Sequence, residues 1–231
     1  YGYLNGTKNL ETTNITGVTA NGLEFGRFYN SYNGYYYTGY LADLRLVNGS
    51  SLYTGSSVSI PSGLSTNVTN TSLLMHFENG NMIDASAKTQ GFATGNAQLD
   101  TSVKKFGTAS AEFDGTGDYM YIPYNYPFST GDFTIECWVY FKTTTTNQGI
   151  FQLDQSPLSG VTYIAPVLFT GGGAYAGRWA TMTKYGGNQS LYANSSYNPS
   201  TETWYHTAVV RNSGTVKVYI DGVEVISVSD Q

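Results

Sequence analysis

The residues best suited to chemistry lie in the run 113–141, FDGTGDYMYIPYNYPFSTGDFTIECWVYF. Its central carboxylate, Glu136, stands between Thr134 and Trp138 when every second residue is counted. A retaining glycosidase needs two carboxyl groups about 5–5.5 Å apart, and no Glu-x-Asp-x-x-Glu motif places a second carboxylate two positions from Glu136. We therefore interpret Glu136 as a hydrogen-bonded structural residue and expect no catalytic residues. Glycoside hydrolysis is the least favoured alternative.

Three further residues of catalytic types, Cys137, His76 and His206, lie inside strand-like runs. Neither histidine accompanies a serine or cysteine in a recognisable nucleophile motif. Cys137 falls on the apolar side of its run, where a thiol acts as a small buried hydrophobe. We expect a structural cysteine and two core or half-buried histidines.

Aromatic residues favour binding over catalysis. The candidate ligand-binding residues are Tyr35, Tyr36, Tyr37, Tyr175, Arg178 and Trp179. Tyrosine offers a large rigid contact area with a polar tip, which suits sugar faces and protein surfaces alike. The last three residues lie in the Gly-rich stretch 171–179, the kind of loop in which a β-sandwich carries a site. The alternative is that the tyrosines pack on their own sheet.

Oxygen donors gather in the loop that follows residue 77. They are Glu78, Asn79, Asn81 and Asp84. Ca²⁺ prefers ligands of this type, so Ca²⁺ is the one cofactor that the sequence suggests. In an Asn-rich chain such a cluster is more often plain turn chemistry, and the metal assignment stays open.

The elements that position these residues are predicted to be β-strands. The 21 Tyr, 27 Gly and only 12% charged residues favour strands and turns, and no window shows the apolar period of a capped helix. From Phe133 to Phe141 apolar residues alternate with others, as in a strand with one buried face. The second face carries Glu136, Trp138 and Tyr140, so we expect it to be half covered or concave.

A second strand is expected near residues 40–46. Its apolar face is predicted to hold Tyr40, Ala42, Leu44 and Leu46. Asp43 and Arg45 then share the opposite face, where we expect a solvated charge pair worth a few tenths of a kcal/mol.

The net charge of the chain is −5. Nucleic acids and anionic membranes both require a basic patch on the protein that binds them. We therefore expect no nucleic-acid partner and no membrane insertion.

Several motifs in this chain match the typical motifs of a known family. They are SLLMHFENGN at 72–81, KFGTASAEFDG at 105–115, GDFTIECW at 131–138, WYHTA at 204–208, YIDG at 219–222 and GYLADLRLVNGSSLY at 39–53. On these motifs the chain resembles the concanavalin A-like, laminin-G-like jelly-roll modules. The resemblance implies a two-sheet antiparallel β-sandwich that usually serves binding or adhesion. It implies no particular ligand, because fold and function separate.

The order of the motifs predicts a permuted domain organisation. The resemblance assigns residues 1–61 to the C-terminal part of a sandwich, 62–71 to a linker, and 72–231 to the N-terminal and central part of a sandwich. Together they make about one full module, permuted across a repeat boundary. The hairpin Tyr3-Leu4-Asn5-Gly6 also matches Tyr219-Ile220-Asp221-Gly222, 216 positions later. This match indicates a tandem repeat, with chance similarity of two hairpins as the alternative.

These observations predict a non-catalytic tandem-repeat module of a fibre or adhesin, extracellular or on a virion surface. Its expected partner is a glycan or a surface protein, bound through aromatic loops. The alternative is a purely structural repeat of a filament or virion appendage, in which the aromatics form subunit contacts. We also expect adjacent copies to associate head-to-tail, with one terminal hairpin packing against a neighbour.

Overall fold

The computed structural model describes residues 2–4, 7–10, 19–29, 34–55, 57–77, 92–127, 131–154, 169–170, 179–185, 188–193 and 198–229. Within these ranges every named element is a β-strand. Correspondingly, none of the described residues forms a helix long and apolar enough to span a bilayer. This is the all-β architecture that the composition predicts.

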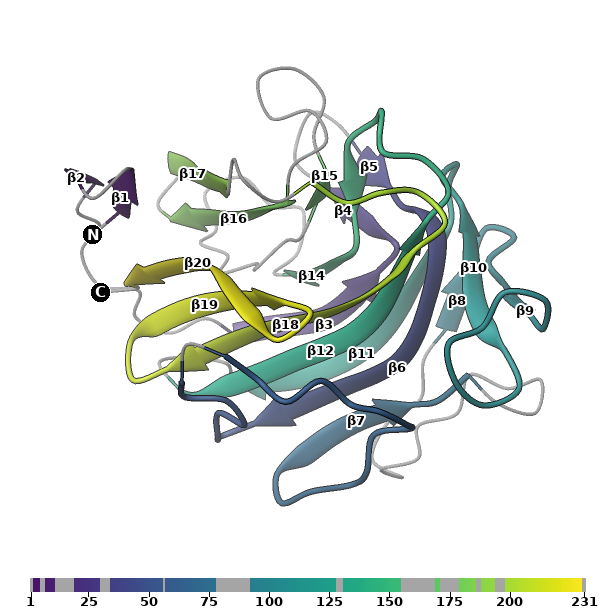
Figure 1. Ribbon diagram of the computed structural model, residues 1–231, viewed down its shortest axis with the longest axis horizontal. Coiled ribbons are helices and arrows are strands. Elements are labelled where there is room, and N and C mark those ends of the chain that lie inside the picture. The colour runs from purple at the N-terminus through teal and green to yellow at the C-terminus, as the bar shows by residue number, and fades with distance from the viewer. Residues whose placement is uncertain are drawn as a thin grey trace.

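The larger sheet has eight antiparallel strands and lies at the front of Figure 1. In spatial order they are β20 (Val223–Ser229), β19 (Thr215–Ile220), β18 (Trp204–Asn212), β12 (Phe133–Phe141), β6 (Thr38–Asn48), β10 (Ser110–Asp114) and β9 (Gln98–Asp100), with β7 (Thr71–Met75) also paired to β6. The segment 49–70 connects β6 to β7 and runs across the front of this sheet (Figure 1).

A second sheet of four strands lies behind the first (Figure 1). Its order is β14 (Phe151–Asp154), β3 (Thr19–Phe25), β11 (Tyr119–Pro127) and β8 (Phe92–Thr94). Smaller sheets are formed by β13 (Gln148–Gly149), β15 (Phe169–Thr170), β16 (Trp179–Tyr185) and β17 (Asn188–Ala193), by β4 (Arg27–Tyr29) and β5 (Gly34–Tyr36), and by β1 (Gly2–Leu4) and β2 (Thr7–Leu10). The protein is a two-sheet antiparallel β-sandwich.

The core fills the space between the two sheets. From β12 it takes alternate residues, namely Phe133, Ile135, Cys137, Val139 and Phe141, each at most 1% exposed. The second sheet contributes Leu23, Phe25, Met120, Ile122 and Phe151 to the same cluster. Each such side chain stabilises the fold by about 1.5–3 kcal/mol when it is fully buried. The predicted alternation of β12 and the structural role of Cys137 are confirmed.

Strand β6 is irregular at its middle. Residues Thr38 to Leu41 pair with β10, whereas Leu44 to Val47 pair with β7. Against β12, Glu136 faces Arg45 and Trp138 faces Ala42, so β6 has one extra residue at this point. This is a β-bulge, in which an added residue bends the strand and redirects its side chains.

The bulge corrects the predicted faces of β6. Leu41, Leu44 and Leu46 all face the core, whereas Tyr40 and Ala42 do not belong to that cluster. Asp43 has φ 51°, in the left-handed region that few L-residues adopt. A strict alternation fails here because the extra residue shifts the pattern by one position.

The segment 62–71, predicted as a linker, contains no strand before Thr71. It nevertheless packs on the larger sheet, because Ser65 is buried and donates from its backbone N and its hydroxyl to the Asp43 carboxylate. Residues 19–48 supply β3 and β6, which lie within the two principal sheets beside strands from 92–229. The predicted domain boundaries stay predictions.

Tyr37, one of the predicted ligand-binding residues, is fully buried. Its hydroxyl accepts a hydrogen bond from Tyr140 N at 3.1 Å and lies 3.0 and 2.8 Å from the carbonyl oxygens of Tyr40 and Tyr140. Its ring packs against Phe113 and Phe141. Tyr37 therefore has no surface to offer a ligand and serves to hold β6 against β12.

Replacing Tyr37 by phenylalanine should destabilise the protein by about 1–3 kcal/mol, because it leaves buried backbone groups without their hydroxyl partner. For a chain of this size the melting temperature should fall by about 2–4 °C per kcal/mol, measured by thermal unfolding. Tyr205→Phe is the matched control, because Tyr205 is also a buried tyrosine but its hydroxyl accepts a hydrogen bond from the backbone N of Ser200, an exposed residue. Equal losses in both variants would contradict this account of Tyr37.

Candidate binding face

The outer face of the larger sheet carries the polar and aromatic residues of β12. They are Thr134, Glu136, Trp138 and Tyr140, which alternate with the core residues. Their neighbours across β18 are Val210, Ala208, His206 and Trp204 respectively. Three zones follow one another along this face, and they differ in how far they are covered.

The first zone surrounds Glu136, which is 1% exposed. Arg45 Nε donates to Glu136 Oε1 at 2.6 Å, and Arg45 Nη2 forms an ion pair with the same oxygen. The other oxygen, Oε2, accepts from the Tyr53 hydroxyl at 2.7 Å and lies 3.0 Å from His206 Nε2. Both oxygens are therefore engaged, as predicted for a hydrogen-bonded structural residue.

The pKa of Glu136 is held below its usual 4.5 by its partners. Desolvation is the largest single effect and raises this pKa, since burial disfavours the charged carboxylate. The hydrogen bonds from His206 and Tyr53 and the charge of Arg45 together outweigh it. Glu136 is thus a buried anion whose charge is balanced locally.

Asp43 and Arg45 do not form the solvated pair that the sequence suggested. Both are buried, at 2% and 8% exposure, and each has another partner. The Asp43 carboxylate accepts from Ser65 Oγ at 2.7 Å, and His76 Nε2 lies 3.7 Å from it. Burial is the main cause that raises the pKa of Asp43, against the lowering effect of Ser65 and His76. The bulge explains the difference, because it separates the two side chains.

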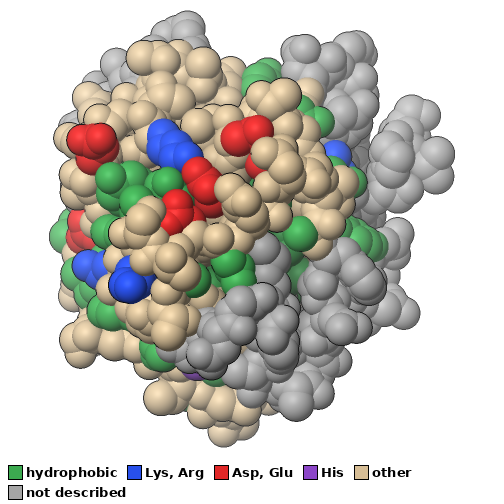
Figure 2. All heavy atoms as spheres, turned by 90° about the vertical axis from the view of Figure 1, so that its right-hand side faces the viewer, with side chains coloured by type: hydrophobic (Ala, Val, Ile, Leu, Met, Phe, Trp, Pro, Cys, Tyr) green, Lys and Arg blue, Asp and Glu red, His purple; other side chains and the backbone are tan. Residues whose placement is uncertain are grey.

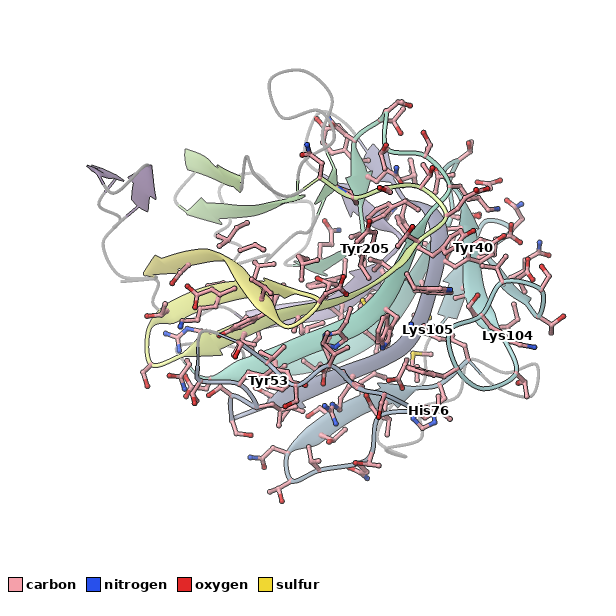
Figure 3. The ribbon with its side chains drawn as sticks, viewed as in Figure 1. Tyr40, Tyr53, His76, Lys104, Lys105 and Tyr205 are labelled. Atoms are coloured by element: carbon pink, nitrogen blue, oxygen red, sulfur yellow. The ribbon has the colours of Figure 1, made fainter. Side chains whose placement is uncertain are left out.

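Both histidines take the positions expected for core or half-buried residues. His206 is 1% exposed beside Glu136, and His76 is half-buried with Nε2 2.9 Å from the Ser65 carbonyl oxygen. Figure 3 labels His76 near β7 and Tyr53 on the segment that crosses the sheet.

The segment 49–66 covers the first zone. Leu52 N donates to Thr134 Oγ1 at 3.0 Å, and the Tyr219 hydroxyl donates to the Gly55 carbonyl oxygen at 2.6 Å. Further along, Arg45 Nη1 donates to the Thr66 carbonyl oxygen at 3.1 Å. These bonds fix the segment over Glu136 and close this part of the face to large molecules.

The second zone is centred on Trp138, which is 5% exposed. Lys105 Nζ lies 4.0 Å from the centroid of its ring, and Phe106 packs edge-on against it at 5.6 Å. His206, its cross-strand neighbour on β18, also packs against it, with ring centroids 5.5 Å apart. Among the described residues, neither Trp138 Nε1 nor His206 Nδ1 has a hydrogen-bond partner.

The third zone is an aromatic ladder, defined here as Tyr40, Tyr140 and Trp204. The three residues lie directly opposite one another on β6, β12 and β18. Their ring centroids are 5.4 Å apart for Tyr40 and Tyr140 and 5.3 Å apart for Tyr140 and Trp204. Tyr140 and Trp204 are partly exposed. Cross-strand aromatic pairs stabilise a sheet, and two members of this set can also contact a ligand because they are partly exposed.

Polar side chains border the aromatic ladder on the side of β10. Lys142 forms an ion pair with Glu112, and its Nζ lies 4.8 Å from the centroid of the Tyr40 ring. Gln98 Nε2 donates to Glu112 Oε2 at 3.0 Å, and the Tyr40 hydroxyl lies 3.4 Å from Asp100 Oδ2. In Figure 2, which shows the right-hand side of Figure 1, basic and acidic side chains lie close together among hydrophobic ones. Donors and acceptors are therefore both available there.

The sequence-predicted ligand-binding residues are not part of the aromatic ladder. Tyr35 and Tyr36 are partly exposed on β5, where they face Phe28 and Arg27. Tyr175 and Arg178 lie outside the described residues, and of Trp179 only the backbone, at the start of β16, is described. For these five residues a binding role stays a prediction.

The predicted Ca²⁺ ligands Glu78, Asn79, Asn81 and Asp84 also lie outside the described residues. Within the part of the chain that the structure describes, no three His, Cys, Asp or Glu side chains are grouped to hold a metal ion. A Ca²⁺ site at 78–84 stays a prediction.

Comparison with known families decides the assignment of the fold. The laminin G family model described as the concanavalin A-like lectin/glucanases superfamily matches residues 114–231, slightly more than half of the chain. The chain belongs to this superfamily. The match covers β12 and β18 to β20, whereas β3 and β6 lie outside it. No curated protein and no solved structure gives a significant match.

Members of the concanavalin A-like superfamily share a sandwich of this kind, so membership accounts for the two sheets. It leaves the ligand open, because the superfamily name includes both lectins and glucanases. The outer face of the larger sheet therefore has to be judged by its own residues.

Replacing Glu136 by glutamine should destabilise the protein by about 3–5 kcal/mol at neutral pH, because Arg45 is left as an uncompensated buried charge. Because the folded-state pKa of Glu136 is lowered, its contribution to stability is present above the unfolded value of 4.5 and is lost as the pH falls through the folded pKa. The variant should therefore lose less stability than the parent between pH 6 and pH 3, measured by urea unfolding.

Asp43→Asn is the matched control for this pH dependence. The folded-state pKa of Asp43 is raised, so protonation of Asp43 favours the folded state as the pH falls. The Asp43 variant lacks this favourable protonation, so its free energy of unfolding should fall more steeply with decreasing pH than that of the parent. The same acid profile in both variants would contradict the assigned pKa directions.

Proposed function

We propose that this chain is a non-catalytic saccharide-binding module and that the aromatic ladder is its binding surface. The supporting observation is the alignment of Tyr40, Tyr140 and Trp204 across three adjacent strands, with Tyr140 and Trp204 partly exposed. Aromatic faces stack on the apolar faces of sugar rings. Strand positions also hold these rings more rigidly than a loop would, which lowers the entropy lost on binding.

The polar border of the ladder favours a saccharide over an apolar ligand. A sugar hydroxyl both donates and accepts hydrogen bonds, and the border offers the Asp100 carboxylate beside the Tyr40 hydroxyl and the Glu112 carboxylate in an ion pair with the ammonium of Lys142. Those opposite charges are paired, so the site favours a neutral ligand over a polyanion.

The non-catalytic part of the proposal rests on Glu136. Its carboxylate already binds Arg45, Tyr53 and His206, and the segment 49–66 covers it. A nucleophile or general acid must reach the glycosidic bond, within about 3 Å of the proton or carbon concerned. Catalysis by Glu136 would require the covering segment to leave and these three bonds to break.

The wider setting is part of the same proposal. We infer that the module belongs to a fibre or adhesin with several such modules, extracellular or on a virion surface. The repeated hairpin of residues 3–6 and 219–222 supports a repetitive protein. The same observation favours the second candidate, a structural repeat of a filament, in which the aromatic ladder forms contacts between subunits.

The saccharide proposal is tested with Trp204→Ala and Tyr140→Ala on a glycan array, followed by titration calorimetry with an oligosaccharide that the parent binds. Each substitution should weaken binding at least about tenfold, or about 1.4 kcal/mol. Ile60→Ala is the matched control, because Ile60 is also exposed and apolar, at 41%, but lies in the segment 49–70. It should leave the affinity unchanged.

The double variant Tyr35→Ala/Tyr36→Ala separates the two candidate surfaces. If it abolishes binding while the two ladder variants bind normally, the site lies at β5 and the proposal is wrong. If the parent binds no glycan and Trp204→Ala instead changes its self-association in light scattering, the structural repeat is the better assignment.

A further inference from the structure

The hairpin β1–β2 repeats the hairpin β19–β20 in its strand register. Leu4 pairs with Thr7 just as Ile220 pairs with Val223, 216 positions later in both strands. The next pairs also correspond. They are Tyr3 with Lys8 and Tyr219 with Glu224, then Gly2 with Leu10 and Val218 with Ile226.

A shared irregularity strengthens this correspondence. The register of β1–β2 shifts between Gly2 and Tyr3, and that of β19–β20 shifts between Val218 and Tyr219. These are equivalent positions. An Asn-Gly or Asp-Gly turn favours a two-residue hairpin by itself, but it does not dictate a bulge at one particular pair. Chance similarity of two turns would therefore explain the turns but not the shared position of the bulge.

The core-facing positions of β19–β20 have apolar counterparts in the first hairpin. Val218, Ile220 and Ile226 belong to the core of the sandwich. Leu4 and Leu10 occupy the sequence positions that correspond to Ile220 and Ile226, 216 residues later. Gly2 is the one departure, because it replaces Val218. The sequence of β1–β2 thus suits a position on the same kind of sheet, with its apolar residues toward a core.

In this chain β1–β2 forms a two-stranded sheet by itself and pairs with neither principal sheet. Figure 1 shows it beyond β20, the last strand of the larger sheet. A two-stranded hairpin alone is marginally stable in water. The place that suits it, beside β18, is occupied by β19–β20 of its own chain.

We propose that β1–β2 is equivalent to β19–β20, the hairpin that completes the larger sheet beside β18. In this proposal β1–β2 docks beside β18 of an adjacent copy of this chain, covalently linked or free. A second copy is the partner because the hairpin matches β19–β20 in register, bulge and apolar positions, and only a sheet of this kind carries the complementary strand. The proposal goes beyond saccharide binding, since it concerns how modules join. Sheet edges commonly recruit a strand from another chain in this way.

Interchange of the two hairpins tests the docking geometry. In one chimaera residues 217–226 are replaced by residues 1–10 carrying Gly2→Val, so that the core position is filled. This chain should unfold cooperatively, with a melting temperature about 5–10 °C below that of the parent, as expected from a few lost surface contacts such as the Lys217–Glu224 ion pair.

The control chimaera carries the same ten residues moved by one position, with the last leucine placed first. A slip of one residue turns every side chain to the opposite face, so this chain should lose cooperative unfolding. If the two chimaeras are equally destabilised, the hairpins are not equivalent and the proposal falls.

Docking on a second copy is tested by refolding the full chain at rising protein concentration, followed by size-exclusion chromatography with light scattering. The fraction of dimers and larger oligomers should increase with protein concentration, because β1–β2 of one copy then competes with β19–β20 of another copy for the edge of β18. A chain that begins at Thr12 should stay monomeric and keep its circular dichroism, since β1–β2 pairs with neither principal sheet. Identical size distributions for both chains would exclude the second copy as partner.

Discussion

The buried charge of Glu136 is the constraint on which the larger sheet depends. Removing a carboxylate and a guanidinium from water costs several kcal/mol for each ion, so the pair persists only where its geometry is good. Here Arg45 on β6, His206 on β18 and Tyr53 on the covering segment all reach one side chain on β12. The network adds little net stability over an apolar core, but it specifies which strands meet and in which register.

The network specifies the register because a shift of one strand along its neighbour would have a large cost in free energy. Moving β12 by one residue would bring Glu136 into the core and Cys137 to the outer face. The carboxylate would then lose all of its partners. The β-bulge at Asp43 belongs to the same design, since it lets Ala42 and Arg45 share the outer face while Leu41 and Leu44 share the core. It also turns Asp43 toward Ser65, which holds the segment 62–71 against the sheet.

Strand β12 could be predicted from the sequence because one simple period governs it. Phe133 to Phe141 alternate strictly, and both the core role of Cys137 and the structural role of Glu136 follow from that alternation. The faces of strand β6 could not be predicted in this way, since the extra residue at Asp43 shifts the alternation and no local sequence signal marks the shift. The charge pair predicted from that period was wrong for the same reason.

The aromatic ladder was missed for a different reason. Tyr40, Tyr140 and Trp204 are each ordinary strand residues, about 100 and 64 positions apart in the chain. They become neighbours only through the pairing of three strands, and long-range register is not written in any local pattern. Composition pointed instead to the tyrosines at 35–37, where local density is high. Of these, Tyr37 proved to be a core residue, because its hydroxyl ties β6 to β12.

The aromatic ladder and the hairpin site beside β18 lie at different places on the larger sheet, so saccharide binding and the joining of modules are compatible. Strand β18 pairs with β19 from Thr207 to Asn212, and at the turn after β19 the Asp221 carboxylate accepts a hydrogen bond from His206 N. Trp204 therefore lies beyond the reach of the hairpin, at the end of β18 that faces the ladder. A hairpin from an adjacent copy that replaces β19–β20 would occupy the edge of β18 from Thr207 to Asn212 and would not cover Tyr140 and Trp204. Modules joined in this way would each keep their own saccharide surface, so that weak single sites would combine through multivalency.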